Sequence, residues 1–326
     1  QIGKRKKRTM SKKLISQIIL SYRNLPGIYE TLDSVLMQDY PYIEIVISYD
    51  GSPEFEDEIP KIKRYVQEHK KENIKNLVMN AIAVNGGTVK NINSALDCCT
   101  GEYIKILSAE DCLSNETVLS DCYEFLQAEQ ALICFGKMRG VLPDGSYKYE
   151  LLACESDYDL LKSMTVEQLR NRLYARNYLP APAWFARKEL FEQYGKFPEC
   201  ARLIEDYPYW CHLAQEGVRF TFLDKVIIDY KLSGVSSTGV YGEQFMNDMF
   251  AIYDTFIFPF DTRYGVLQPV YNRIKKAGLN FYMSKARWGK MSMGAKVKSY
   301  LKYGVFYAYT GWQEFVNRRD NRKKGK

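Results

Sequence analysis

The sequence predicts an α/β fold in which a mostly parallel sheet is flanked by helices and followed by a helical C-terminal extension. Two patterns lead to this fold class: short apolar segments that suit buried strands, and intervening segments whose apolar residues recur at helical spacing. Strands separated by helices form βαβ units, which place neighbouring strands parallel. A chain of 326 residues, of which 46% are hydrophobic, is long enough to build such a domain and an extension.

The first half of the chain alternates regularly between the two patterns. The run ISQIILS at 15–21 is short and mainly apolar, as expected of a buried strand. Residues 27–38 follow, with Ile28 and Leu32 on one helical face. The expected strands are 15–21, 43–48, 77–84, 103–107 and 131–135, and the expected helices are 27–38, 58–71, 89–96 and 115–128.

The second half of the chain is less regular. Two prolines frame a short apolar run at 183–186, a helix is expected over 206–215, and strands are expected over 220–223 and 226–230. Beyond residue 242 the pattern is helical and rich in Tyr, Phe and Met. We therefore expect three parts: a basic N-terminal segment at 1–13, native or partly vector-derived, an α/β domain at 14–240, and a helical, basic and aromatic extension at 241–326.

Charge is distributed unevenly along the chain, whose net charge is +7. Residues 1–13 carry +7 and residues 273–326 carry +13, so the body at 14–272 carries −13. An acidic body argues against a nucleic-acid binder, which needs its cationic face on the folded domain. The basic and aromatic C-terminal residues favour an anionic membrane surface as a partner, although a solvated basic face packed on the domain would have the same composition.

Several function classes are excluded by the motifs that the sequence lacks. The eight cysteines show no CxxC spacing and the chain has two histidines, so zinc sites of the HExxH kind are ruled out. Neither the GxGxxG fingerprint of dinucleotide enzymes nor the P-loop of NTPases occurs. No apolar run is long enough to span a membrane and no leader is visible, so we expect a cytoplasmic protein with reduced thiols.

Polar clusters follow four of the expected strands. In a parallel sheet the carboxyl ends of the strands share one edge, where ligands bind. Each cluster alone is typical of a turn or a helix cap. Together they offer an aromatic platform, a hydrogen-bond acceptor for a base, a cation and two carboxylates, which suits a nucleoside diphosphate bridged by a divalent ion. The clusters are Tyr22-Arg23-Asn24, Asp50-Gly51-Ser52, Asn85-Gly86-Gly87 with Lys90, and Ser108-Ala109-Glu110-Asp111.

Longer stretches around these clusters carry a resemblance to a known family. They are SQIILSYRN and ETLDSVLMQDYPYIEIVISYDGS, then NGG and NINSALDCCTGEYIKILSAED, and then LIEDYPYW. From about residue 13 to residue 237 the chain resembles the inverting family 2 glycosyltransferases of the GT-A fold, a Rossmann-like architecture common in bacterial surface-polysaccharide synthesis. The resemblance implies an enzyme that moves a hexosyl or N-acetylhexosaminyl group from a nucleoside-diphosphate sugar, with UDP as the usual nucleotide, to a saccharide hydroxyl.

The resemblance also implies roles for residues of the donor site. Tyr22 would lie against the nucleobase, Asp50 would accept a hydrogen bond from the base, and Lys90 would face the diphosphate. Glu110 takes the place of the metal-binding acid of the DxD signature and would ligate Mn²⁺ or Mg²⁺. Asp111 follows it as the extra acid of that signature and is expected to contact the substrate.

Two positions depart from the family pattern. Tyr49 replaces the first acid of the DDGS motif, and Ser108 replaces the first Asp of the DxD signature, although Ser108 is still expected among the substrate contacts. These departures keep a second hypothesis open, a catalytically silent module that binds sugar nucleotides or glycans. A membrane-associating scaffold without nucleotide affinity is a third.

The acceptor side of the expected site comes from the second half of the chain. Glu205 and Asp206 stand where the family's ED motif stands, Glu205 as a substrate contact and Asp206 as the general base. A helix N-cap is the alternative role for Asp206. Trp184 either lines the acceptor pocket or packs in the core. Together with the basic C-terminal residues, the resemblance implies a lipid-linked saccharide acceptor and a peripheral enzyme at the inner face of the cell membrane.

Overall fold

The structure is a computed structural model that describes residues 12–51, 54–142, 145–148, 155–179, 181–232 and 242–306. Contacts between residues divide the chain into two compact units, Gln1–Gly234 and Val235–Lys326. The first unit carries the sheet with its flanking helices, and the described part of the second unit is helical.

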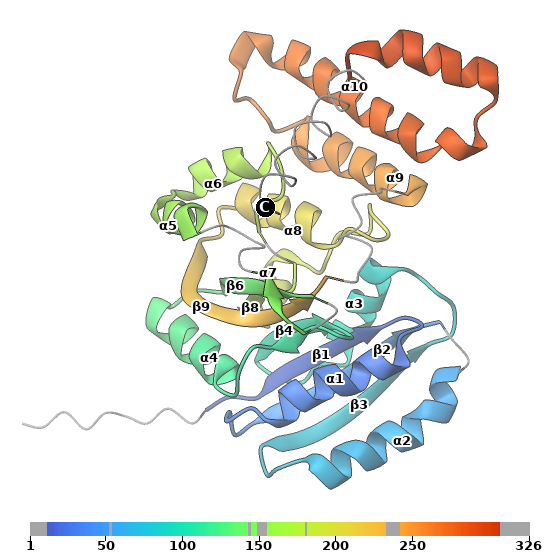
Figure 1. The fold of residues 1–326 in the computed structure, drawn as a ribbon. Helices are drawn as coiled ribbons and strands as arrows, with labels where there is room; N and C mark the ends of the chain where they lie inside the picture. The colour runs from blue at the N-terminus through green and yellow to red at the C-terminus, as the bar shows by residue number, and fades with distance from the viewer. Residues whose placement is uncertain are drawn as a thin grey trace, which may run out of the picture. The chain divides into compact units, whose positions relative to one another are not determined.

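Nine strands of the described residues form one mixed sheet (Figure 1). They are β1 (Ile15–Ser21), β2 (Ile43–Asp50), β3 (Ile74–Ile82), β4 (Tyr103–Ser108), β5 (Cys112–Leu113), β6 (Ile133–Val141), β7 (Tyr147–Lys148), β8 (Trp184–Arg187) and β9 (Phe220–Lys231). Their order is β3-β2-β1-β4-β8-β6-β9-β5, and β7 pairs with β6. β1 pairs in parallel with β2 and β4, and β2 pairs in parallel with β3. β8 lies antiparallel between β4 and β6, so the sheet is parallel at one end and mixed at the other.

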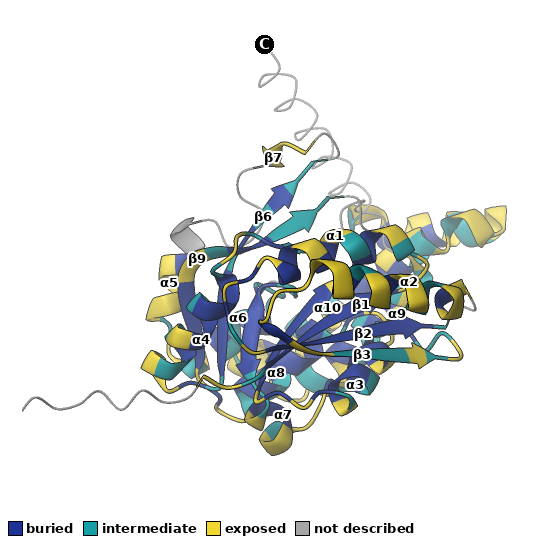
Figure 2. Ribbon diagram, turned by 90° about the horizontal axis from the view of Figure 1, so that it is seen from below, coloured by how far each residue is buried: buried dark blue, intermediate teal, exposed yellow. Residues whose placement is uncertain are grey.

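Helices connect the strands and cover both faces of the sheet. In the first unit they are α1 (Leu25–Leu36), α2 (Glu54–His69), α3 (Thr88–Asp97), α4 (Val118–Glu129), α5 (Glu155–Ser163), α6 (Val166–Leu173), α7 (Glu189–Tyr194) and α8 (Asp206–Gln215). Figures 1 and 2 show α1 and α2 on one face of the sheet and α3 on the other. This arrangement follows from right-handed crossovers, because the chain reverses direction across the sheet after β3.

The core lies between the sheet and these helices. Every residue of β1 and β2 is buried, as expected of strands that are covered on both faces. Figure 2 shows the same contrast, with strands mostly in the buried colour and the outer sides of the helices exposed. α1 begins two residues earlier than expected, because Pro26 suits its first turn and the Asn24 side chain accepts a hydrogen bond from Gly27 N at 3.1 Å.

The α/β class and the mostly parallel sheet are confirmed, with differences in individual elements. The strand expected at 131–135 continues to Val141 as β6. β9 is one strand of 12 residues where two were expected, because shifts in its register with β6 let the strand continue past the polar residues between the two apolar runs. Helices α5, α6 and α7 lie where no helix was expected.

The second unit is built from helices alone in its described part. These are α9 (Glu243–Ile252), a π-helix at Tyr253–Ile257, short 3₁₀ helices at Gly265–Leu267 and Trp288–Lys290, α10 (Gln268–Ala286), and a further helix at 293–306. Phe281 of α10 is fully buried, and its ring stacks on that of Phe306 at 5.7 Å between centroids. Among the helices that the structure describes, none combines the length and the apolar character needed to cross a bilayer.

Candidate functional site

The carboxyl ends of β1, β2 and β4 bring three of the expected polar clusters to one edge of the sheet. In the register of these strands Ser21 pairs with Tyr49, and Leu20 pairs with Ser108. Neighbouring strands lie about 4.8 Å apart, so the ends of β2 and β4 are about 10 Å apart across β1. The residues that follow these strands are therefore within the span of one nucleotide.

Asp50 holds the turn that follows β3. Its Oδ1 accepts a hydrogen bond from Gly86 N at 2.7 Å, and its Oδ2 accepts one from Gly87 N at 2.8 Å. The side chain is 3% exposed, so these two bonds satisfy a carboxylate that is shielded from most of the solvent. A carboxylate has about four lone-pair sites, so each oxygen can still accept from a ligand. The geometry fits a rigid hydrogen-bond acceptor for a nucleobase.

Arg202 ties the same turn to the segment that precedes α8. Its Nη2 donates a hydrogen bond to Asn85 O at 3.1 Å and another to Asn85 Oδ1. Its carbonyl accepts a hydrogen bond from Val89 N at 3.3 Å. Gly87 has a φ of 90°, and a Cβ there would clash with Arg202 Cγ. The turn held by Asp50 and the approach to α8 are therefore one connected structure.

Asp206 is the first residue of α8 and is 8% exposed. Its Oδ2 accepts a hydrogen bond from Asn177 Nδ2 at 2.7 Å, and its Oδ1 accepts one from Tyr207 N at 2.7 Å. The N-cap of α8 is Glu205, whose side chain makes no capping bond, so the N-cap alternative does not describe Asp206. Because Arg202 is four positions before Asp206, their Cα atoms lie at most about 14 Å apart, which keeps Asp206 near the Gly87 turn.

Burial raises the pKa values of both acids of this pair. For Glu205, burial is the larger cause and the neighbouring Asp206 carboxylate adds to it. For Asp206, burial outweighs the hydrogen bonds from Asn177 and Tyr207, which act in the opposite direction. Two adjacent acids with raised pKa values are typical of groups that exchange protons near neutral pH.

Glu110 lies over the first turn of α1. Its Oε1 accepts a hydrogen bond from Asn24 Nδ2 at 2.7 Å, and its backbone N donates to Thr31 Oγ1 at 3.0 Å. Its φ is 89°, a left-handed conformation that is strained for a residue with a side chain. Gly27 makes room for it, because a Cβ there would lie 2.6 Å from Glu110 Cγ. The surrounding hydrogen bonds hold Glu110 in this conformation.

Asp111 points into the protein rather than toward solvent. It is 6% exposed, its Oδ1 accepts a hydrogen bond from Lys231 N at 3.4 Å, and burial raises its pKa to about 7. The buried Lys105 on β4 is the nearby cation, and burial lowers its pKa to about 8. Lys105 Nζ donates to Ile106 O at 3.0 Å. Contact of Asp111 with substrate was expected from the sequence; the structure shows a buried carboxyl joined to β9 through Lys231 N, and the substrate role stays a prediction.

Four other expected site residues differ in their exposure. Tyr22 is 45% exposed after β1, Lys90 is exposed on the first turn of α3, and Ser108 is exposed at the end of β4. Trp184 is buried among aromatic rings, as the core alternative expects, and its place in an acceptor pocket stays a prediction. The rings around Trp184 belong to Phe191, Phe197 and Trp210, each with its centroid about 6 Å away.

Tyr49, at the position of the family's first acid, is a core residue. It is 1% exposed and stacks on Phe55 with 4.4 Å between ring centroids. Its hydroxyl has no hydrogen-bond partner among the described residues. At this position the side chain packs against α2.

The residues at this edge fit a divalent cation that the substrate helps to hold. Within the described ranges there is no group of three His, Cys, Asp or Glu side chains that could bind a metal alone. Mg²⁺ is commonly held by one or two carboxylates with substrate phosphates and water completing its shell. Glu110 supplies one carboxylate beside the strand ends, which is the donor such a site needs.

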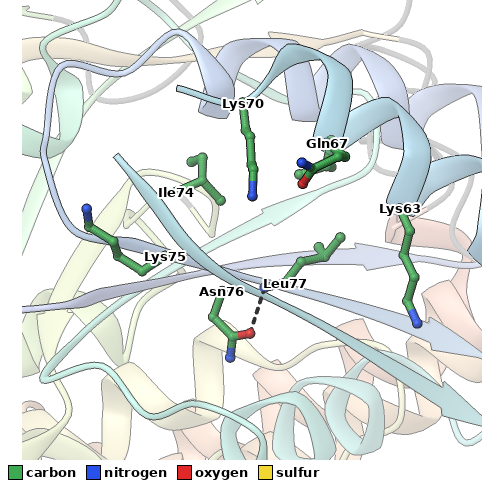
Figure 3. Close-up of a pocket in the computed structure, with 8 residues that line it drawn as sticks. Lys63, Gln67, Lys70, Ile74, Lys75, Asn76 and Leu77 are labelled. Atoms are coloured by element: carbon green, nitrogen blue, oxygen red, sulfur yellow. Dashed lines mark hydrogen bonds between the residues drawn. The ribbon is translucent and has the colours of Figure 1, made fainter. Parts of the chain in front are cut away.

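A pocket of about 320 Å³ lies elsewhere, between α2 and the beginning of β3. Figure 3 shows that Lys63, Lys70 and Lys75 surround it. The beginning of a parallel strand is at the sheet edge opposite its carboxyl end, so this pocket is separate from the cluster around Asp50 and Glu110.

Arg202 and Asn177 were not expected from the sequence. Arg202 bonds to a residue 117 positions away and Asn177 to one 29 positions away. No local pattern marks either residue, because a contact between distant segments is set by the fold. The ED motif gave the only available signal, since Arg202 lies close before it in the chain.

Comparison with known proteins places this site in context. The profile of the family described as Glycosyl transferase family 2 matches residues 16–195. The uncharacterized glycosyltransferase EpsJ of Bacillus subtilis is 26% identical over 228 residues, 70% of this chain and 63% of EpsJ. The poly(ribitol-phosphate) beta-glucosyltransferase of Bacillus spizizenii is 29% identical over 152 residues, 47% of this chain and 23% of that enzyme. The chain thus spans less than two thirds of the length of either relative.

Two solved structures share the fold at low sequence identity. The structure of S. aureus TarS 1–349 in complex with UDP-GlcNAc has a TM-score of 0.58 at 20% identity, with 90% of this chain and 80% of that one covered. The mannosyltransferase PcManGT from Pyrobaculum calidifontis, in complex with GDP-Man and Mn²⁺, has a TM-score of 0.56 at 18% identity, with 92% and 83% covered. At this identity the likeness establishes the architecture.

Proposed function

Because the chain belongs to glycosyltransferase family 2, we propose that it is an inverting enzyme that transfers a sugar from a nucleoside-diphosphate sugar to a saccharide hydroxyl. The observation that carries the proposal is the connection of Asp206 to Asp50. Asp206 is a buried acid with a raised pKa, and Arg202 links its segment to the turn that Asp50 holds. This link supports a site in which the proposed proton acceptor, Asp206, lies near the strand ends proposed to bind the nucleotide.

The donor lies along the carboxyl edge of the strands. Tyr22 stacks on the base, Asp50 accepts a hydrogen bond from it, and Lys90 attracts the diphosphate. UDP is the proposed nucleotide, and the UDP-GlcNAc held by the TarS structure supports it. A hexosyl or an N-acetylhexosaminyl group is the proposed sugar.

Glu110 is the proposed ligand of a divalent ion, Mn²⁺ or Mg²⁺. When bound, such an ion neutralises the negative charge of the diphosphate. The Mn²⁺ in the PcManGT structure supports the choice of metal, and Asn24 keeps the Glu110 carboxylate in place. Ser108 offers a hydroxyl at the adjacent strand end for a water or a ribose contact.

Asp206 is the proposed general base. As the acceptor oxygen bonds to C1, its proton passes to the Asp206 carboxylate and the bond from C1 to the diphosphate oxygen breaks. A single displacement of this kind inverts the configuration at C1. Asn177 and the backbone N of Tyr207 each bind one Asp206 oxygen, which fixes the carboxylate while leaving each oxygen a lone pair. Glu205, beside it, is a proposed contact to the sugar.

The proposed acceptor is a lipid-linked saccharide at the inner face of the cell membrane, where the enzyme is peripheral. The support is charge: residues 262–306 contain ten Lys and Arg and no Asp or Glu. Basic segments of this kind are attracted to anionic lipid surfaces.

A thermal-shift panel of UDP-, GDP- and dTDP-sugars, with and without Mn²⁺, tests the proposal. A nucleotide at about a hundred times its dissociation constant stabilises a fold by about 2.7 kcal/mol, which raises the melting temperature by several degrees. We expect the largest rise with a UDP-sugar and Mn²⁺, and slow hydrolysis of the same donor. Absence of a rise with every donor would contradict the proposal.

A catalytically silent binding module is the second candidate function. The core position of Tyr49 and the serine at position 108 favour it, because both positions lack an acid of the family pattern. This candidate predicts a nucleotide-dependent thermal shift without hydrolysis or transfer, over donors and acceptors that include lipid-linked saccharides.

A further inference from the structure

The helix at 293–306 has an inner face that packs on α10. Ser299 and Tyr303 are buried on this face. The ring of Phe281 on α10 lies 6.3 Å from that of Tyr303 and 5.7 Å from that of Phe306. These contacts fix how the helix is rotated within its unit, so its opposite face is defined.

The opposite face carries a stripe of exposed apolar side chains. Its members recur every four residues, the spacing that places side chains on one side of a helix. They would form a row about 18 Å long at 1.5 Å per residue. A continuous apolar row with such high exposure is typical of a surface that binds another surface. The stripe consists of Met293, Val297, Leu301 and Val305, which are 77%, 52%, 82% and 83% exposed.

The charges that the helix itself carries are of one sign. Lys298 and Lys302 are exposed on the same helix, next to Val297 and Leu301. The nearest acidic residues in the sequence are Asp261 and Glu314, so the helix itself carries no negative charge. Apolar residues bordered by lysines match the two layers of an anionic bilayer surface, acyl chains beneath and phosphates above.

We infer that the stripe of helix 293–306 docks on an anionic phospholipid surface, with Met293, Val297, Leu301 and Val305 in the interface and the lysines toward the phosphates. The inference deepens the proposed function, on which it rests for the idea that the acceptor is held in that membrane. The inference commits to one face of one helix. Charge complementarity favours lipid over a second copy of this chain, whose equivalent helix would carry the same positive charge.

Sedimentation with vesicles tests the docking face in the full chain. The vesicles contain equal parts of phosphatidylglycerol and phosphatidylcholine, with pure phosphatidylcholine as the comparison. The test variant is Leu301→Glu with Val305→Glu, and the matched control is Leu160→Glu on α5, where the leucine is also exposed. We expect the wild type and the control to bind the anionic vesicles and the double variant to bind them at least tenfold less well.

A second variant separates lost binding from lost folding. Lys298→Glu with Lys302→Glu keeps the apolar stripe, and we expect weaker binding to anionic vesicles with unchanged melting temperature. Equal binding by wild type and both variants, or no binding by wild type, would overturn the inference. If the wild type were dimeric and did not bind vesicles, and the Leu301→Glu, Val305→Glu variant were monomeric, the stripe would be an interface with a second copy of the chain instead. The UDP-sugar thermal shift is measured on the same samples: its loss with vesicle binding intact would contradict the proposed function and leave the docking face standing.

Discussion

The two sides of the candidate site are built in different ways. On the donor side, Asp50 ends a parallel strand and both of its oxygens accept hydrogen bonds from backbone N–H groups of one turn. On the side of the proposed general base, Asp206 begins a helix next to a second acid, Glu205, and burial raises the pKa values of both. One side uses a carboxylate to fix the backbone, and the other keeps two carboxylates in an environment that disfavours their charge.

This difference matches the two roles that we propose, binding for Asp50 and proton transfer for Asp206. A carboxylate bound by backbone N–H groups stabilises the fold and presents its remaining lone pairs in a fixed direction. A buried acid beside another acid costs stability when it ionises, and it accepts protons at a higher pH than an exposed acid does. Variants on the two sides should therefore affect binding, catalysis and stability in different proportions.

Asp206→Asn should have the largest effect, and it should fall on catalysis. The amide keeps the shape of the side chain but accepts no proton, so the transfer rate should fall about 10²- to 10⁴-fold. Binding of the UDP-sugar, measured by thermal shift, should change little because the proposed role of Asp206 is toward the acceptor. Asp159→Asn, an exposed acid on α5, serves as the matched control.

The opposite result would contradict the proposed division between donor binding and proton transfer. If Asp206→Asn kept the full transfer rate and lost UDP-sugar binding instead, Asp206 would belong to the donor side and another group would serve as base. Glu205→Gln is the informative companion, since a base at position 205 would move the rate loss to that variant.

Asp50→Ala should mainly affect stability and donor binding. The change leaves Gly86 N and Gly87 N without their acceptor. Hydrogen bonds to a charged group contribute about 1.5–3 kcal/mol each, so we expect a loss of about 3–6 kcal/mol in the free energy of unfolding. UDP-sugar affinity should fall at least about tenfold. Urea denaturation and nucleotide titration measure both, and an unchanged urea midpoint would show that the turn holds without Asp50.

The parallel end of the sheet was predictable because its signals are local. The strand at Ile15–Ser21 has the expected bounds, and the helices and strands up to β4 follow the expected alternation. The mixed end was harder to predict. β9 continues through the polar residues around Asp224, where the sequence pattern predicted a break between two strands. Its pairing with β6 on both sides of this point keeps it one strand. Pairing between strands far apart in the sequence is a property of the fold and leaves no local pattern.

The same physical difference limits what the sequence says about the site. Asp50 and Glu110 could be placed at one edge because each follows a parallel strand. Their roles, like that of Asp206, stay predictions. The substrate contact expected of Asp111 also stays a prediction; the structure adds that Asp111 is buried and that Glu110 has a left-handed backbone conformation. A single backbone angle of this kind cannot be read from residue types.

Arg202→Ala should have an intermediate effect on activity, and it should change both donor binding and catalysis. The change removes the hydrogen bonds to Asn85 and the packing against Gly87, while the backbone bond from Val89 N to the carbonyl at position 202 remains. We expect kcat/KM to fall about tenfold, equivalent to about 1.4 kcal/mol, through both a higher KM for the donor and a lower kcat.

The control for this variant is Arg219→Ala. Arg219 is also exposed and donates to Glu129 Oε2 at 3.0 Å, but it lies away from the strand ends. We expect it to leave both kinetic constants unchanged. If Arg202→Ala changed the donor KM alone, the link would support binding without positioning Asp206, and the two sides would act independently.

The pH dependence of the melting temperature and of the transfer rate should be the smallest of these effects. A carboxyl pKa that is raised on folding stabilises the fold fully below the unfolded value, near 4, and this contribution is lost as the pH rises through the folded value. Burial raises the pKa of Asp206 to about 6, that of Asp111 to about 7 and that of Glu205 to about 8, so the melting temperature should decline between about pH 4 and pH 8. The transfer rate should rise several-fold over the same range, because the base must be ionised.

Asp206→Asn removes the contribution of the base and the part of the Glu205 shift that the Asp206 charge causes, and it leaves the contribution of Asp111. The amide does not titrate, so the decline in melting temperature of this variant should be shallower than that of wild type. Parallel melting curves for wild type and Asp206→Asn across this range would mean that ionisation at position 206 costs the fold nothing, and the distinction between a structural and a reactive carboxylate would then lose its basis.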